Sequence, residues 1–303
     1  IGMGKSGARE LNYVSDVDVI YVAESADEEI VSEQRAVEIA TRLAMLTARG
    51  IMELAIEPGL WEVDANLRPE GKAGALVRTL DSHLAYYERW ASSWEFQALL
   101  KARAMAGDLE LGRRYEAAIA PKVWASASSR EHFVEGVQKM RQRVTDHIPA
   151  DEVDVQLKLG PGGLRDIEFT VQLLQLVHGL GDESIRQRGT LPALAALVDH
   201  GYIGRLEGAE FAEDYRFLRV LEHRLQLSRL RRTHLMPTDE DELRTLARAS
   251  GIASTGGALQ ERWLAVKQQV RELHERIFYR PLLSAVAAIP EEGLQLTSEQ
   301  AEA

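Results

Sequence analysis

Helical periodicity dominates this sequence from residue 80 onward and limits most of the chain to an all-helical arrangement. Apolar residues recur there at spacings of three and four, which is typical of amphipathic helices. The main interruption is the run 155–159 with the glycine cluster 160–163. We predict helices over 80–91, 94–106, 108–120, 129–147, 163–178, 190–200, 208–233, 239–250 and 257–287.

The first 80 residues combine strand and helix patterns. The β-branched run 17–22 predicts a buried strand, 61–67 alternates with period two, and 33–46 has helical spacing. A further short strand is expected at 75–78. The sequence therefore predicts an α+β fold. It places a small mixed-sheet domain with helices at 1–110, a helical bundle domain at 111–288 and a linker or tail at 289–303. The start at Ile1 and the polar, acidic end predict a piece of a longer polypeptide.

Composition excludes several classes of protein. The formal net charge of −11 argues against a dedicated nucleic-acid binder, which needs a basic face. The sequence has no cysteine, so it has no disulfide, thiol nucleophile or Cys-ligated metal. No apolar run approaches the ~18 residues of a membrane span. We therefore expect a cytoplasmic protein without nucleic-acid or membrane partners, whose metals would bind to oxygen ligands with or without histidine.

Two carboxylates follow a glycine turn at the start of the first predicted strand. Asp16 and Asp18 are two positions apart, so they project from the same face of a strand. Such a pair repels itself unless a cation lies between the two groups, and Mg²⁺ prefers carboxylate oxygens. Asp64, in the second strand, can supply a third ligand. A solvated strand edge explains the pair alone, but the glycine turn, the apolar continuation and the second acidic strand favour a metal site.

Other features are better explained by structural roles. His178, His223 and His234 lack a metal-ligand spacing, so we expect them to be hydrogen-bonded or solvated. Tyr86, Tyr87, Trp90 and Trp94 fall at helical spacing and predict a core stripe rather than a base-stacking platform. The arginine-rich segment 216–232 is interpreted as a solvated helix face.

Five segments together resemble one enzyme family. Residues 2–20, which contain the glycine turn and the acid pair, are similar to the nucleotidyltransferase motif of glutamine synthetase adenylyltransferase/adenylyl-removase. The resemblance continues, in the same order along the chain, through 63–74, 94–103, 158–169 and 221–226. These segments are most similar to actinobacterial members of the family. It implies a nucleotidyltransferase-type domain before the helical bundle.

The resemblance also implies an activity. Enzymes of this family carry two related units, one that removes AMP from a glutamine synthetase tyrosine by phosphorolysis and one that adds AMP from ATP. Asn12, where the adding unit typically has glycine, and the tail after Leu283 are similar to the removing unit. We therefore predict Mg²⁺-dependent deadenylylation that releases ADP and controls nitrogen assimilation. The alternatives are the adenylylating direction and a non-catalytic module that binds the PII signalling protein or glutamine synthetase.

Site residues and partners follow from the same resemblance. Asp16, Asp18 and Asp64 would be the catalytic acids and would hold one or two Mg²⁺ ions, for which Mn²⁺ can substitute. The expected partners are adenylylated glutamine synthetase, PII, inorganic phosphate or ADP, and a carboxy-terminal adenylyltransferase unit of the same chain. Asp166 and Glu168 are further candidate acids, although acids at the start of a helix are favoured in any case. The phosphate- or nucleotide-binding candidates are Gly4, Lys5, Ser6, Gly7, Ser15, Arg68, Lys72 and Arg165.

Overall fold

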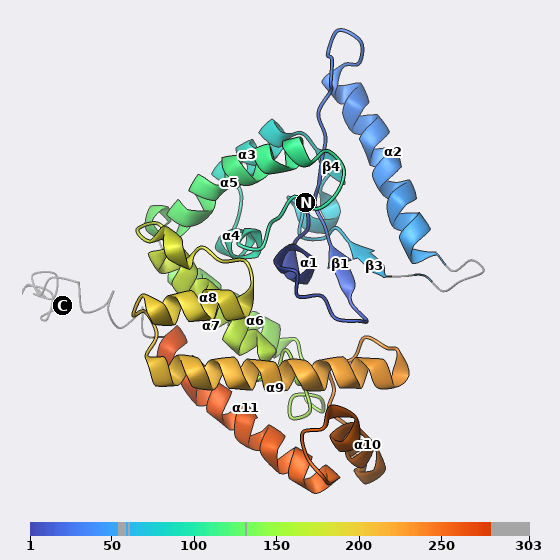
Figure 1. Cartoon of the computed structure of the whole chain (residues 1–303). Helices are drawn as coiled ribbons and strands as arrows, with labels where there is room; N and C mark the ends of the chain where they lie inside the picture. Colours follow the sequence, from blue (N-terminus) through green and yellow to red (C-terminus); the bar gives the residue numbers. More distant parts are fainter. Residues whose placement is uncertain (54–58, 60, 131, 280–303) are drawn as a thin grey trace, which may run out of the picture.

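The computed structural model describes residues 1–53, 59, 61–130 and 132–279 (Figure 1). Its first part contains short strands and one long helix. The elements are α1 (Gly4–Ala8), β1 (Asp16–Asp18), β2 (Tyr21–Val22), α2 (Glu33–Met52), β3 (Glu62–Asp64), η1 (Gly71–Ala73) and β4 (Val77–Arg78).

The remaining described residues are almost entirely helical, as the periodicity predicts. The elements are α3 (Leu80–Arg89), α4 (Ser93–Leu99), α5 (Leu109–Ser129), α6 (Phe133–Asp146), α7 (Leu164–His178), η2 (Glu183–Ile185), α8 (Thr190–Asp199), α9 (Arg205–Arg229), α10 (Glu240–Ser250) and α11 (Gly256–Phe278). The α+β class is therefore confirmed. No helix among the described residues is long and apolar enough to cross a membrane.

The strands form two small parallel pairs. β1 pairs with β3, which sets Asp16 beside Glu62 and Asp18 beside Asp64, and β2 pairs with β4. The prediction of one strand over 17–22 is wrong, because the chain changes partners within it. The Ile20 N–H donates to the carbonyl oxygen of Ile1 at 2.9 Å, between the two pairs. The mixed character that we predicted is limited, in the described residues, to single antiparallel bridges such as Gly2 to Val19.

Several helices differ in length from the sequence prediction, and α4 and α5 show how. Helix α5 continues past the predicted end at residue 120 and through Pro121, and it buries Val123 and Ser126 beyond the proline. Tertiary packing of this face thus offsets the backbone hydrogen bond that proline removes. Helix α4 is shorter than predicted and ends at Leu99. The predicted helical end 280–287 and the linker 289–303 lie outside the described residues.

Helix α7 lies between the two large apolar clusters and is buried on nearly all sides. Its Ile167 and Val171 belong to the cluster of α7–α11, whereas Phe169 and Leu173 pack with the amino-terminal residues and α3–α6. The second cluster contains both Met3 and Tyr115, so residues before and after 110 share one core. The division into domains at 110 stays a prediction.

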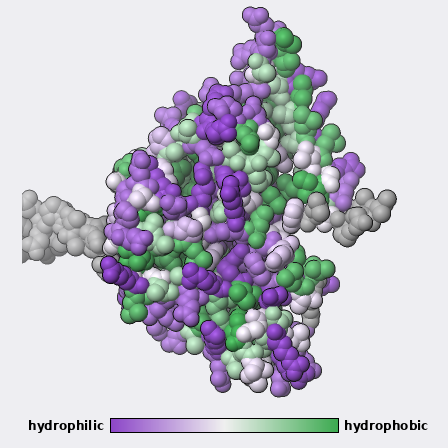
Figure 2. Space-filling model, viewed as in Figure 1, coloured by the Kyte–Doolittle hydropathy of each residue, from purple (hydrophilic) through white to green (hydrophobic). Residues whose placement is uncertain are grey.

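Surface hydropathy differs between the parts of the molecule. Figure 2 shows hydrophobic surface along the α2 region, where Leu43, Met45 and Leu46 are exposed. Only Ala44 is buried among the described residues of α2. This helix therefore contributes little to the core that positions the acidic residues.

Candidate functional site

The parallel strands β1 and β3 bring three carboxylates together. Asp16 and Asp18 project from the same face of β1, and the register places Asp64 directly beside Asp18. One carboxylate oxygen from each residue lies within 4.8 Å of the others. The geometry therefore matches the acidic cluster that the sequence predicts, and the role of that cluster stays a prediction.

The glycine turn at α1 packs tightly against this cluster. Gly4 has φ +50°, and a Cβ there would lie 2.4 Å from Oδ2 of Asp18. The hydroxyl of Ser6 lies 2.7 Å from the carbonyl oxygen of Met3 and 2.8 Å from that of Asp18. A Cβ on Gly7 would overlap the carbonyl oxygen of Lys101. Ser6 and Gly7 thus hold the turn, and Gly4 keeps space open beside the acids.

The three carboxylates carry uncompensated negative charge. Burial raises the pKa of Asp18 to about 6, with further contributions from the charges of Asp16 and Asp64. Asp16 has a partial counter-charge, because the guanidinium of Arg232 lies 2.9 Å from its Oδ2. Oxygen ligands with surplus negative charge are the donor set that Mg²⁺ prefers. The residues therefore fit a divalent cation.

A cavity of about 430 Å³ opens beside the acids, and its charged end contains residues of both signs. Gly4, Asp16 and Asp18 line the cavity together with five further charged side chains. Burial lowers the pKa of Lys158 to about 8, with added repulsion from Arg165 and Lys5. Within the described part of the chain, no side chain pairs with the Lys158 ammonium. The other five charged residues of the lining are Lys5, Lys101, Lys158, Arg165 and Glu168.

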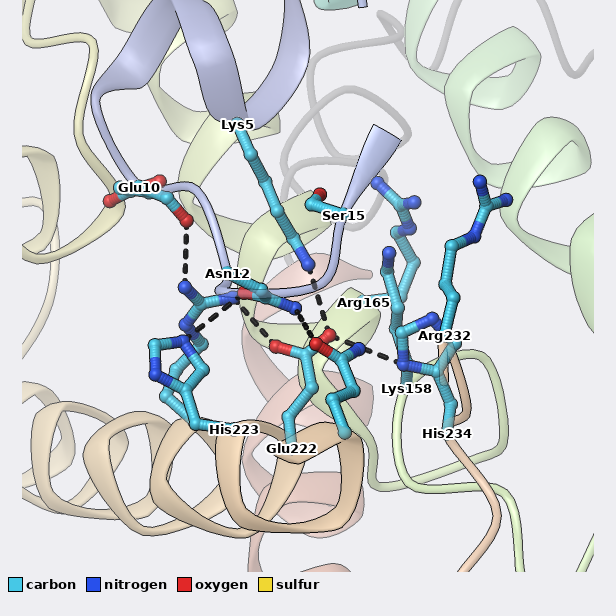
Figure 3. Close-up of polar contacts among 12 residues, drawn as sticks. Lys5, Glu10, Asn12, Ser15, Lys158, Arg165, Glu222, His223, Arg232 and His234 are labelled. Atoms are coloured by element: carbon cyan, nitrogen blue, oxygen red, sulfur yellow. Dashed lines mark hydrogen bonds and ion pairs between the residues drawn. The ribbon is translucent and has the colours of Figure 1, made fainter. Parts of the chain in front are cut away.

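Lys5 is anchored below the cavity by a buried carboxylate on α9 (Figure 3). Its Nζ lies 3.0 Å from Oε1 of Glu222, which also lies 3.2 Å from Nδ1 of His234. Arg219 binds the other oxygen of Glu222 at 2.6 Å. Burial alone would raise the pKa of Glu222, but the His234 hydrogen bond and the neighbouring cations lower it well below its usual range.

The segment between α1 and β1 is bound to the same helix. The Nδ2 of Asn12 donates to Oε1 of Gln226 at 3.0 Å, and Nε2 of His223 lies 3.2 Å from Oδ1 of Asn12. Arg219 donates to the carbonyl oxygen of Glu10 at 2.7 Å. Figure 3 shows Glu222 and His223 extending from α9 toward this loop. Helix α9 therefore fixes the loop that precedes the acid pair.

Several predicted site residues lie elsewhere. The Arg68 guanidinium donates to the carbonyl oxygens of Ala65, Lys72 and Gly74, so it braces the loop after β3. Lys72 is exposed and is not part of the cavity lining. The hydroxyl of Ser15 lies 3.4 Å from Oδ1 of Asp16, at the edge of the cluster.

The two further candidate acids on α7 point to different surroundings. Asp166 is buried against Arg141, and it accepts a hydrogen bond from the Gly162 backbone N–H at 2.6 Å. It therefore joins α6 to the second glycine cluster. Glu168 lines the cavity and lies 3.1 Å from Arg165. Of the two candidate acids Asp166 and Glu168, only Glu168 therefore lines the cavity.

Sequence reasoning missed residues that come from distant segments. Trp94 lines the cavity, whereas the aromatic stripe was expected to be core; Tyr87 is fully buried, as expected, and Trp90 is 75% exposed. The solvated-face interpretation of 216–232 is wrong for Arg219, because Glu222 and the Glu10 carbonyl bind it. Helical spacing gave one usable signal, since α4 and α7 each turn residues spaced by three or four positions to the cavity.

Comparison with known proteins gives consistent results along the whole chain. A family model described as glutamate-ammonia ligase adenylyltransferase matches residues 1–118, and one described as GlnD PII-uridylyltransferase matches residues 131–278. Together, the two matched segments contain the three aspartates and all of the residues that line the cavity.

Three similar proteins are each named bifunctional glutamine synthetase adenylyltransferase/adenylyl-removing enzyme. They come from Leifsonia xyli (68% identical over 100% of this chain), Streptomyces coelicolor (57% over 99%) and Corynebacterium efficiens (52% over 99%). These matches span 31%, 30% and 28% of the relatives, so the chain corresponds to about 30% of their length. The relatives are actinobacterial, as the resemblance predicted.

Proposed function

We propose, since this chain is 57–68% identical along 99–100% of its length to bifunctional glutamine synthetase adenylyltransferase/adenylyl-removing enzymes, that it belongs to their family and that its acidic cavity is a nucleotidyltransferase active site of the removing direction. In that reaction a phosphate oxygen forms a bond to the phosphorus of the adenylyl group. The bond from that phosphorus to the tyrosine oxygen breaks. ADP and the unmodified tyrosine of glutamine synthetase are the products.

The observation that carries the proposal is the acid cluster at the mouth of a cavity that also contains cations. Asp16, Asp18 and Asp64 would hold one or two Mg²⁺ ions, and Mn²⁺ offers the same coordination chemistry. A bound ion supplies charge neutralisation and polarisation at the phosphorus. Gly4 leaves room beside Asp18 for a phosphate group to approach.

The cations of the cavity would bind the anionic oxygens of the reactants. Lys158 has no partner in the described residues, so its ammonium is free to bind a phosphate oxygen. Arg165 offers a planar guanidinium suited to two oxygens of one phosphate. The departing phenolate has a reference pKa near 10, which makes it a better leaving group than an alkoxide. Positioning and charge neutralisation would therefore provide most of the rate enhancement.

Asn12 supports the removing direction. The resemblance associates asparagine at this position with the removing unit, and glycine with the adding unit. Here the Asn12 amide binds Gln226 and His223 on α9, contacts that glycine cannot make. The adenylylating direction would use the same acids with ATP as donor, and the same residues can be tested for both.

Phosphorolysis is the direct test. The chain is incubated with adenylylated glutamine synthetase, Mg²⁺ and inorganic phosphate, and ADP release is measured. We expect ADP only when phosphate is present, and strongly reduced release with Asp18→Asn. Asp199→Asn, at an exposed position at the end of α8, is the matched control and should retain activity.

Two results would contradict the proposal. Incorporation of AMP from ATP into unmodified glutamine synthetase, without phosphate-dependent ADP release, would assign the opposite direction. If neither ADP release nor AMP incorporation is detected, but the chain binds PII or glutamine synthetase, the non-catalytic binding module would be favoured.

A further inference from the structure

The cavity has lining residues beyond those that the proposed chemistry uses. Helix α4 turns Trp94, Gln97 and Ala98 toward it, at spacings of three and one. Helix α7 turns Phe169 and Gln172 toward it, one and two turns beyond Arg165. Residues at i, i+3, i+4 and i+7 share one helix face. The lining face of α7 therefore runs from the charged Arg165 and Glu168 to Phe169 and Gln172, and α4 adds a mainly apolar face that contains the amide of Gln97.

The two amides bind each other and leave one hydrogen-bonding atom free on each. Nε2 of Gln97 donates to Oε1 of Gln172 at 2.8 Å. Gln97 is only 4% exposed, and its Oε1 is buried without a hydrogen-bond partner among the described residues. Nε2 of Gln172 has no partner there either. With oxygen and nitrogen interchanged in both amides, the free donor would be on Gln97 and the free acceptor on Gln172, which is the reverse order.

An unpaired buried acceptor is unfavourable and indicates a missing donor. Leaving such a group without a partner costs about 1–3 kcal/mol, so buried acceptors in native proteins are nearly always paired. An acceptor beside a donor complements adenine, whose exocyclic amino group donates next to a ring nitrogen that accepts. Glutamine and asparagine amides recognise adenine through this same pattern. Guanine and hypoxanthine carry a carbonyl oxygen at that position and would face the Gln97 oxygen.

We propose that Gln97 and Gln172 form an adenine-recognition subsite, which selects the base of the nucleotide. This inference rests on the proposed function, because it assumes that the acidic end holds the nucleotide's phosphate. Arg165 and Gln172 are seven residues apart, or about 10 Å along α7. That separation suits a nucleotide whose phosphate lies at the acids and whose base lies at the amides.

The surroundings of the amides also suit a planar base. Trp94 is half-buried at the edge of the cavity, so one face of its indole is available for stacking. Stacking of a base on an aromatic side chain contributes about 1–3 kcal/mol whatever the base. Met140 and Val144 of α6 add apolar lining. Stacking would therefore supply affinity, and the two amides would supply selectivity for adenine.

Binding of ADP and IDP tests the subsite without any assay of turnover. The two nucleotides differ at position 6, where IDP has a carbonyl oxygen in place of the amino group, and at the neighbouring ring nitrogen, which carries a hydrogen in IDP. Calorimetry with the whole chain and Mg²⁺ should give about tenfold or tighter binding of ADP than of IDP. Gln97→Met and Gln172→Met should each abolish this preference. Gln175→Met is the matched control on α7, because that side chain binds the carbonyl oxygens of Ile185 and Gln187 and should not affect base choice.

The outcomes separate this inference from the proposed function. Equal binding of ADP and IDP by the unaltered chain overturns the subsite, and it needs no folded variant. A preference retained in both glutamine variants also overturns it. If either occurs while phosphate-dependent ADP release persists, only the subsite is wrong. If no nucleotide binds and no ADP is released, the subsite and the proposed function are both wrong.

Discussion

Two carboxylate centres near the glycine turn, one partly exposed and one buried, have opposite electrostatic surroundings. Burial and two neighbouring aspartates raise the pKa of Asp18 to about 6. Glu222 is fully buried, yet its pKa is lowered, because His234, Lys5 and Arg219 outweigh burial. One centre is left with surplus negative charge, and the other is fully compensated.

The difference separates a binding centre from a structural one. A compensated carboxylate has its oxygen atoms occupied by the protein and has little to offer a ligand. An acidic cluster whose one ion-pair partner among the described side chains is Arg232 keeps oxygen atoms for a cation. Lys5 belongs to both regions, since it lines the cavity and binds Glu222. The compensated centre therefore holds a cation in place for the uncompensated one.

The largest effect should come from breaking the compensated centre. Glu222→Gln removes the charge that pairs with Lys5, Arg219 and His234, and leaves cations buried without a counter-ion. Loss of one partner of a buried ion pair typically lowers the free energy of unfolding by about 3–5 kcal/mol. Urea unfolding at pH 7 measures this change. Glu213→Gln, on the same helix but exposed, should have little effect. Equal stability of the two variants would contradict a structural role for Glu222.

The same variant gives a defined pH dependence. The pKa of Glu222 is lower in the folded chain than in the unfolded chain, whose glutamates have pKa values near 4.3. As the pH falls, the unfolded state therefore binds the proton first, and the stabilisation is lost progressively below about pH 4. Unfolding of the two proteins should thus differ most at neutral pH, and the difference should decrease in acid.

The uncompensated centre should respond differently to the loss of its charge. Asp18→Asn removes repulsion with Asp16 and Asp64, so the metal-free variant should be at least as stable as the unaltered chain. Phosphorolysis should nevertheless fall by about 10²- to 10³-fold, the range found when one electrostatic contact to a transition state is removed. Parallel measurement of unfolding and of ADP release tests both parts. A variant that unfolds early would place Asp18 with Glu222 as a structural residue.

The sequence predicted the acid cluster because its geometry is local. Period two in a strand places Asp16 and Asp18 on one face, and a second acidic strand is the natural neighbour of the first. The register that sets Asp64 beside Asp18 follows from the pairing of these strands. The helices were predicted for the same reason, since spacings of three and four are visible within one element.

The compensated centre could not be predicted in this way. Lys5 and Glu222 are separated by 217 positions, and the local pattern around Glu222 indicates only an amphipathic helix. Its place depends on how α9 packs under α1, which no short-range spacing encodes. The same holds for Arg232, which reaches Asp16 from the far end of α9, and for the glutamine pair of α4 and α7. Long-range packing created these contacts.

Added Mg²⁺ should stabilise the acidic centre alone. A ligand at about 100 times its Kd raises the free energy of unfolding by about 2.7 kcal/mol. We expect this increase in the unaltered chain and, by the same amount, in Glu222→Gln, whose acid cluster is intact. Asp64→Asn should lose it. The measurement is thermal or urea unfolding with and without Mg²⁺. An increment that disappears in Glu222→Gln but persists in Asp64→Asn would reverse the assignment of the two centres.

The smallest effect concerns the only counter-charge that the described side chains place within ion-pair distance of the acids. Arg232 is 47% exposed and lies 2.9 Å from Asp16 and 3.1 Å from Glu62. Its guanidinium competes with a metal ion for the Asp16 carboxylate, so Arg232→Gln should lower the Kd for Mg²⁺. Exposed pairs of this kind are worth about 0.2–1 kcal/mol, which corresponds to at most a fewfold change. Because solvent ions screen such pairs, the change should decrease at high salt.

Arg231→Gln, the exposed neighbour without an ion pair in the described structure, is the control in the calorimetric titration. Weaker Mg²⁺ binding in Arg232→Gln than in this control would mean that Arg232 holds Asp16 in place for the metal, and the acidic centre would then depend on compensation as the Glu222 centre does.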